Sequence, residues 1–159
     1  MRAMGLAVKV KKNRLDTTVV VLNDDGDRDV ALDVSNVRVE ATFEINSGVD
    51  EMANMLGDCA KNFSGRLRGL KPDVVTVRRA DRPARPTNTE GPRMRLLMEG
   101  ALTSSAQQLV AGTTIRNGRE CGSDYGTNKA DLDRVASEIK GGKFSEATAA
   151  ALSGLVANR

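Results

Sequence analysis

Residues 5–46 contain three stretches that predict β-strands. In the first and third, apolar residues alternate with polar or small ones, which is the period of a strand with one buried face, and the second, TTVVVL, is rich in β-branched residues. The first two stretches lie within GLAVKVKKNRLDTTVVVL, residues 5–22, and a short polar turn separates them. The third begins at Val30 and changes phase between Val34 and Val37, which predicts a bulge or bend near this point. Three strands with short connections predict an antiparallel meander.

The rest of the chain alternates helical and strand-like segments. Apolar residues recur at helical spacing from a start at Ser47 until GLKPD, and DVVTV at 73–77 is typical of a strand buried on both faces. The later segments are a helix over 89–109, a strand in AGTTIRN, a glycine-rich loop over 118–126, a helix around 132–139 and a last helix capped by Ser145. This order, β-β-β-α-β-α-β-α-α, predicts one α/β domain over residues 1–159, with a mixed five-stranded sheet and helices on both faces.

Composition excludes several kinds of site. The chain has no histidine, so it cannot build a Ser-His-Asp or Cys-His catalytic arrangement, and a metal site would have to use oxygen ligands. Tryptophan is absent and aromatic residues make up only 3% of the chain, so no stacking platform for single-stranded nucleic acid is expected. Cys59 and Cys121 have no CxxC spacing and are expected to be free thiols. No apolar run suits a signal peptide or a membrane span, so a cytoplasmic location and no membrane partner are expected.

Charge is distributed unevenly along the chain. The formal net charge is +3, but residues 1–15 carry +5, residues 16–58 carry −9, residues 59–100 carry +6 and the remainder carries +1. Such segregation is typical of a surface that binds a polyanion, and equally of charged faces that pair within the protein. Both interpretations stay open on composition alone.

Several stretches resemble segments of the ribonuclease H-like fold and, within it, of the RuvC-type Holliday-junction resolvases. GLAVKVKKNRLDTTVVVL is similar to the first hairpin of that family, and GLKPDVVTVRRAD is similar to the end of its first helix and its fourth strand. NTEGPRMRLLMEGALTSSAQQL is similar to the next helix, and NKADLDRVASEI with FSEATAAALSGLVA is similar to the two closing helices. The resemblance covers nearly the whole chain and implies a RuvC-like domain.

Members of the resembled family use four carboxylates to hold two divalent metals that act on a phosphodiester. Carried over position by position, the first-strand aspartate falls at Lys9, the fourth-strand glutamate at Arg78, and the two acids of the last helix at about Ala147 and Ala150. Two cations would repel Mg²⁺ and alanine offers no ligand, so the resemblance implies an inactive relative with no catalytic residue, no metal and no cofactor. On the last helix only Glu146 stands near the right place.

Two other groups of acidic residues are alternatives for a metal site. The run NDDGD at 23–27, with Asp29, could bind Ca²⁺, but it lacks the ligand order of an EF-hand and also suits a hairpin turn. A nuclease site could also arise anew from acids at strand and helix ends, such as Asp81 and Asp133. The ordinary role of such acids is to cap a helix.

The candidate binding residues are two groups of cations that the resembled fold brings to neighbouring strands. They are Lys9, Lys11, Lys12 and Arg14 in the first hairpin, and Arg78, Arg79, Arg82 and Arg85 after the fourth strand. Because arginine matches phosphate geometry, the merged surface could hold a DNA or RNA backbone without cutting it. We expect Lys9 and Arg78 to lie side by side.

Two further functions stay open. The chain could be a non-enzymatic dimeric scaffold that docks a protein partner, or a divergent metal-dependent nuclease. The resemblance implies a homodimer through the helix that contains Leu97, Gly100, Ala101 and Ser104.

Overall fold

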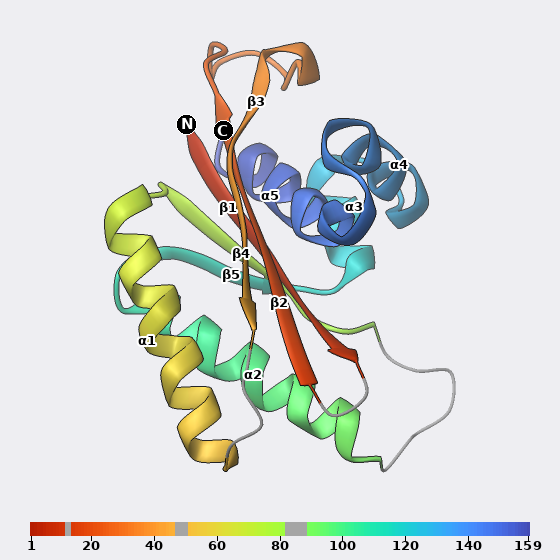
Figure 1. Cartoon of the computed structure of the whole chain (residues 1–159). Helices are drawn as coiled ribbons and strands as arrows, with labels where there is room; N and C mark the ends of the chain where they lie inside the picture. The colour runs from red at the N-terminus through yellow and green to blue at the C-terminus, as the bar shows by residue number, and fades with distance from the viewer. Residues whose placement is uncertain (12–13, 47–50, 82–88) are drawn as a thin grey trace.

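The computed structural model describes residues 1–11, 14–46, 51–81 and 89–159 (Figure 1). Its elements are β1 (Arg2–Lys11), β2 (Arg14–Asp24), β3 (Val37–Asn46), α1 (Met52–Leu70), β4 (Val74–Arg78), α2 (Glu90–Gln107), β5 (Gly112–Arg116), α3 (Gly118–Tyr125), α4 (Lys129–Lys140) and α5 (Ser145–Ala157), with short 3-10 turns at Val34–Asn36 and Gly142–Phe144. The five strands form one sheet in the order β3-β2-β1-β4-β5. The three N-terminal strands pair antiparallel, whereas β4 pairs parallel with β1 and β5, so the predicted mixed sheet is confirmed.

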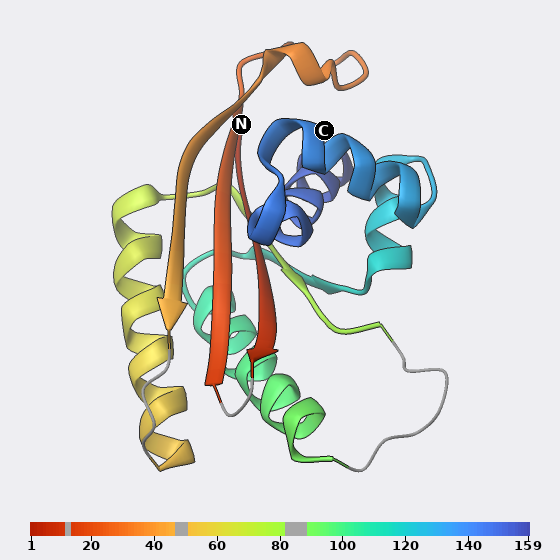
Figure 2. The same ribbon diagram turned by 45° about the vertical axis from the view of Figure 1, so that its right-hand side comes forward.

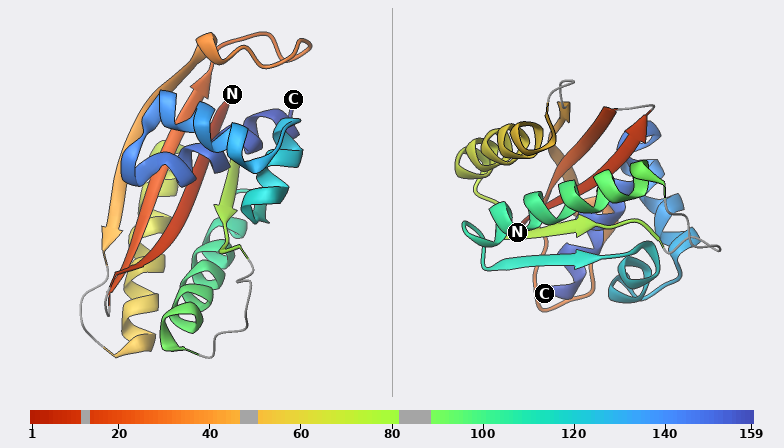
Figure 3. Two further views of the ribbon diagram at one scale, coloured as in Figure 1. Left: turned by 90° about the vertical axis from the view of Figure 1, so that its right-hand side faces the viewer. Right: turned by 90° about the horizontal axis from the view of Figure 1, so that it is seen from below.

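Helices cover both faces of the sheet. Helices α1 and α2 lie on one face, and α3, α4 and α5 lie on the other (Figure 3). Side chains along β1 point alternately to the two faces of the sheet, so the strand contributes to both helical layers. Met4 and Leu6 enter the core under α1 and α2, while Ala3 and Ala7 enter the core under α5. The central strand is therefore buried on both faces, with helices where a parallel pair requires them.

Helix α5 is buried along almost its whole length. Its sequence SEATAAALSGLVA is rich in small residues, and every residue from Ala147 to Leu155 is buried. The helix packs against β1 and β4 on one side and against α3 and α4 on the other. Gly5 in the middle of β1 permits this approach, because a Cβ there would overlap with the backbone of Ala147 and Ala151.

The predicted start of the third strand is wrong. Residues 30–34 do not belong to the sheet, Val30 is 58% exposed, and β3 begins only at Val37. The Asp33 side chain accepts a hydrogen bond from the Ser35 amide and starts a 3-10 turn instead. The Arg159 guanidinium also donates to the carbonyls of Asp27 and Val30, which holds this segment away from the sheet. The predicted irregularity exists further on, as a register shift opposite Val21 and Leu22.

The glycine-rich segment predicted as a loop is helix α3, an element beyond the predicted order. Asn117 and Glu120 form a capping box, in which each side chain accepts a backbone N–H of the other residue. Gly126 ends the helix with a φ of 86°, in the left-handed region that favours glycine. The local signal, NGRE, outweighs the low helix propensity of the glycines.

Two helix starts also differ from the prediction. Glu51 caps α1 by accepting hydrogen bonds from the amides of Ala53 and Asn54, whereas the predicted cap, Ser47, lies outside the described residues. Ser145 is the first residue of α5 rather than its cap, because a 3-10 turn leads directly into the helix. Among the described helices, none is long and apolar enough to cross a bilayer.

Candidate functional site

Those of the predicted basic residues that the structure describes lie toward one end of the sheet. Because β1 and β4 are parallel, their carboxyl ends point toward the same edge of the sheet; β4 ends opposite Ala7, and β1 continues to Lys11, next to the start of β2 (Figure 2). We call this edge the hairpin end. It brings Lys9 and Lys11 from β1, Arg14 from β2, and Arg78 and Arg79 from the end of β4 into one region.

Lys9 and Arg78 share a face of the sheet but are not direct neighbours. The register partner of Arg78 on β1 is Ala7, which is fully buried, and Lys9 lies two residues further toward the hairpin end. The Lys9 ammonium lies 3.7 Å from a carboxylate oxygen of Glu146 on α5. Both side chains lie on the α5 side of the sheet, since residues two apart in a strand point the same way.

Arg78 is the buried charge of this region. It ends a strand, VVTVR, in which every residue is buried, and its guanidinium donates two hydrogen bonds to Asp133 of α4, at 2.7 and 3.3 Å. Burial by itself lowers the pKa of Arg78, but the hydrogen bond and the charge of Asp133 outweigh it, so the pKa is raised. The guanidinium therefore stays charged and paired within the protein.

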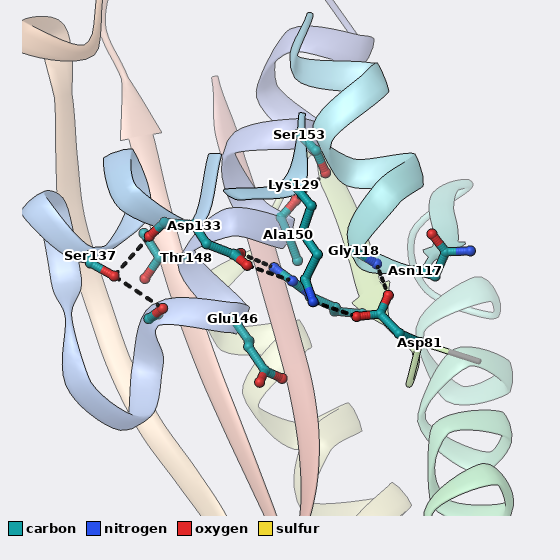
Figure 4. A network of polar contacts seen from close by, with 12 residues as sticks. Asp81, Asn117, Gly118, Lys129, Asp133, Ser137, Glu146, Thr148, Ala150 and Ser153 are labelled. Atoms are coloured by element: carbon teal, nitrogen blue, oxygen red, sulfur yellow. Dashed lines mark hydrogen bonds and ion pairs between the residues drawn. The ribbon is translucent and has the colours of Figure 1, made fainter. Parts of the chain in front are cut away.

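A second ion pair adjoins the first. Asp81 accepts the Lys129 ammonium at 2.6 Å and the backbone N–H of Gly118, the first residue of α3, at 2.9 Å (Figure 4). Burial by itself raises the pKa of Asp81, but the hydrogen bonds from Lys129 and Gly118 and the charge of Lys129 outweigh it. The carboxyl pKa therefore lies below its ordinary value. Asp81 thus holds the starts of α3 and α4 beside the end of β4.

The remaining predicted cations are more exposed and weakly paired. Lys11 lies 3.2 Å from Asp16, and Arg79 donates to Glu120 at 3.0 Å. Arg14 is exposed and, with Lys11, lines a shallow hollow of about 420 Å³. Exposed ion pairs of this kind contribute little stability and are easily exchanged for another anion. Lys12, Arg82 and Arg85 lie outside the described residues.

The four positions that resemble metal-holding carboxylates do not fit divalent metals. They hold two cations, Lys9 and Arg78, and two fully buried alanines, Ala147 and Ala150. Within the described part of the chain, no three histidine, cysteine or acidic side chains are grouped so that they could hold a metal ion. The acids beside these positions face cations, because Glu146 lies near Lys9 and Asp133 pairs with Arg78.

The acidic run after β2 is occupied by internal contacts. The buried Asp24 pairs with Arg159 and accepts a hydrogen bond from the Gly26 amide. Asp25 pairs with Arg38, and Asp27 accepts a hydrogen bond from the Asp29 amide. These carboxylates point to protein donors and hold the segment that leads to β3. The alternative interpretation of NDDGD as a turn-forming sequence agrees with this arrangement.

One buried acid of α2 escapes a sequence-based search. Glu99 is almost fully buried, and one of its oxygens accepts the Arg95 guanidinium at 2.7 Å and the Ala80 amide at 3.0 Å. Burial raises the pKa of Glu99 despite the charge of Arg95. On a helix face, Arg95 and Glu99 look like an ordinary surface pair four residues apart. Here the pair ties α2 to the segment that follows β4.

Comparison with known proteins identifies the fold. No protein-family profile matches the sequence, and no curated protein sequence does. Thermus thermophilus RuvC is similar over 96% of this chain and 92% of its own, with a TM-score of 0.65 and 16% identity. T. thermophilus RuvC in complex with a Holliday junction substrate gives the same coverage, a TM-score of 0.67 and 13% identity. The yeast mitochondrial Holliday junction resolvase Ydc2 gives a TM-score of 0.55 at 13% identity, over 98% of this chain and 78% of the resolvase. The chain therefore has the RuvC-type, ribonuclease H-like fold that the sequence predicts.

Proposed function

We propose that this chain is a catalytically inactive RuvC-like domain that binds nucleic acid through the exposed cations of the hairpin end, Lys11 and Arg14 first among them. The observation that carries the proposal is the exchange of charge at that end. Positions that resemble metal ligands hold Lys9 and Arg78, and exposed cations surround them. The similar fold of T. thermophilus RuvC in complex with a Holliday junction supports DNA as the first ligand to test.

The physical argument concerns how phosphates compete with the internal partners of these cations. The Lys11 side chain is 63% exposed and that of Arg79 is 41% exposed, and their partners Asp16 and Glu120 are 16% and 42% exposed. A phosphate backbone offers many anionic oxygens together and releases condensed counterions when it is bound, whereas an exposed ion pair contributes little. Nucleic acid can therefore displace Asp16 and Glu120 at small cost, which the buried pair of Arg78 does not permit.

The first prediction is a salt-dependent, sequence-independent affinity for nucleic acid. A four-way junction and a duplex, followed by fluorescence anisotropy in EDTA over 25–300 mM KCl, should bind less tightly as salt rises. The variants Lys11→Ala and Arg14→Ala should each weaken binding about equally for any sequence and reduce the salt slope by about one. Arg68→Ala, in the last turn of α1 at the opposite end of the sheet, is the matched control and should bind like the parent.

The same protein and nucleic-acid substrates test whether the chain is a nuclease. We expect no cleavage of the junction, of duplex or of single strands in Mg²⁺ or Mn²⁺. Turnover that EDTA stops, and that is lost on substitution of Asp16, Asp73, Asp81 or Glu146, would make the chain a divergent nuclease instead. If neither cleavage nor salt-dependent binding occurs, the scaffold alternative replaces the binding proposal.

A specific observation favours dimerisation under either alternative. Helix α2 exposes Leu96 (60%) and Leu97 (52%), and next to them Gly100 offers a surface on which nothing lies within 4 Å of an added Cβ. Leu97, Gly100, Ala101 and Ser104 follow one another at helical spacing on a partly or fully exposed face. A small residue at the centre of an apolar stripe lets two helices approach closely.

The second prediction is that Leu97→Glu converts a homodimer into a monomer. A charge in the centre of an apolar contact is costly to bury, so we expect the mass measured by sedimentation equilibrium at micromolar concentration to halve. Val30→Glu, at an apolar site of similar exposure in the segment before β3, should leave the mass unchanged. A parent protein that is already monomeric contradicts this prediction.

A further inference from the structure

The polar network around Arg78 joins three elements that are distant in the sequence. Arg78 ends β4, Asp133 lies 55 residues later on α4, and the Arg78 side chain is 4% exposed. A guanidinium can be buried to this extent only where a carboxylate and further acceptors compensate for the lost water. Asp133 supplies both oxygens, and the charge of Glu146 adds to the same field.

Gly118 shows how tightly this guanidinium is enclosed. A Cβ at Gly118 would lie 2.7 Å from Nη2 of Arg78 and 2.8 Å from the side-chain carbons of Lys129. Lys129 is 46% exposed and can move aside, but the buried Arg78 guanidinium is held in place by Asp133. The absence of a side chain at the start of α3 is therefore matched to the presence of arginine at the end of β4.

The two ion pairs both connect α4 to the end of β4 and the segment after it, with the acid on α4 in one pair and the base on α4 in the other. Asp133 and Arg78 link α4 to β4, while Lys129 and Asp81 link the first turn of α4 to the segment after β4 (Figure 4). The Gly118 amide adds the start of α3 to Asp81. Together these contacts fix the outer helices against the carboxyl end of the central parallel strands, on the face of the sheet where α5 packs against β1.

We infer that Arg78 is an internal cross-link that fixes α3 and α4 to the sheet without any divalent ion, and that it is not a contact for nucleic acid. The pair lies at the position where the resemblance places a metal-holding glutamate, so a permanent cation takes up the charge of the surrounding carboxylates. The inference goes beyond the proposed function and does not depend on it. Its readout is the stability of the fold, whether or not the chain binds DNA.

The test is a double-mutant cycle followed by thermal unfolding. Asp133→Leu leaves the buried Arg78 guanidinium without its partner and should lower Tm by roughly 10 °C, whereas Arg78→Met leaves the Asp133 carboxylate, which is 30% exposed, and should lower Tm by less. The double variant has neither charge, so its loss of Tm should be much smaller than the sum of the losses of the two single variants. Arg134→Met is the control, because Arg134 forms an exposed pair with Glu138 on the same helix (65% and 68% exposed) and should shift Tm by less than about 2 °C. Additive losses, or single variants that behave like the control, overturn the inference.

A second cycle keeps the inference testable if one of these variants does not fold. Gly118→Ala should lower Tm clearly in the parent and by a smaller amount in the Arg78→Met background, where Nη2 is absent. Equal losses in the two backgrounds overturn the proposed match between Gly118 and Arg78. The parent Tm should also be the same in EDTA and in millimolar Mg²⁺, whereas a rise of several degrees in Mg²⁺ contradicts a metal-free cross-link.

Binding separates this inference from the proposed function. Measured well below its Tm, Arg78→Met should bind the junction with the affinity and the salt slope of the parent. A slope reduced by about one shows that Arg78 contacts a phosphate and overturns the inference, while the binding proposal stands. Loss of binding in Lys11→Ala alone leaves the cross-link intact and supports the proposed interface.

Discussion

Replacement of Gly5 by alanine is expected to destabilise the fold strongly. A Cβ at Gly5 would overlap with the backbone oxygen of Ala147 and the backbone nitrogen of Ala151, both in a buried helix. Neither side can yield, because β1 is paired on both edges and α5 is enclosed by α3 and α4. Overpacking against fixed backbone costs more than overpacking against side chains, so we expect a loss of more than about 3 kcal/mol from the free energy of unfolding.

The measurement is urea unfolding followed by circular dichroism. Gly57→Ala is the matched control, since Gly57 lies in the middle of α1 with nothing within 4 Å of an added Cβ. Alanine suits a helix better than glycine does, so the control should raise stability by about 0.5–1 kcal/mol. If Gly5→Ala unfolds at the urea concentration of the parent, the described approach of α5 to β1 is incorrect.

The two glycine substitutions also show which features of the fold can be predicted from sequence. The alternation of Leu6, Val8 and Val10 predicts a strand because it depends only on neighbours along the chain. The need for glycine at position 5 depends on Ala147, which is distant in the sequence, so no local pattern reveals it. Likewise, Val30 and Leu32 have the period of a strand, but contacts with Arg159 hold that segment outside the sheet.

The candidate site likewise has features that the sequence predicts and others that depend on residues distant in the chain. Resemblance places Lys9 and Arg78 on neighbouring strands, and the structure confirms that these strands are adjacent. The partner of Arg78 could not be predicted, because Asp133 looks like an ordinary solvent-facing acid near the start of a helix. Helix α3 was predictable in principle from the capping box of Asn117 and Glu120, which the glycines of the same segment obscure.

Ala147→Asp, which returns a carboxylate to the last helix, is expected to destabilise the fold rather than to restore a metal site. Ala147 is fully buried and belongs to an apolar cluster with Ala3, Ala7 and Ala151. An aspartate is larger than the alanine that fills this site, and its charge would be removed from water in an apolar cluster. We expect a loss of more than about 3 kcal/mol in urea unfolding, and no recovery when Mn²⁺ is added.

Ala157→Asp makes the same exchange at an exposed position at the end of the same helix, and it should change stability by less than about 1 kcal/mol. A buried variant that unfolds like this control, or that Mn²⁺ stabilises, would mean that α5 still leaves room for a metal ion. The expected result has a structural reason. The close packing of α5 on β1 and the buried pair of Arg78 and Asp133 fill the region where metal ligands would have to converge. A metal site could therefore return only if the helix and both strands changed together, and we propose an interface of exposed cations in its place.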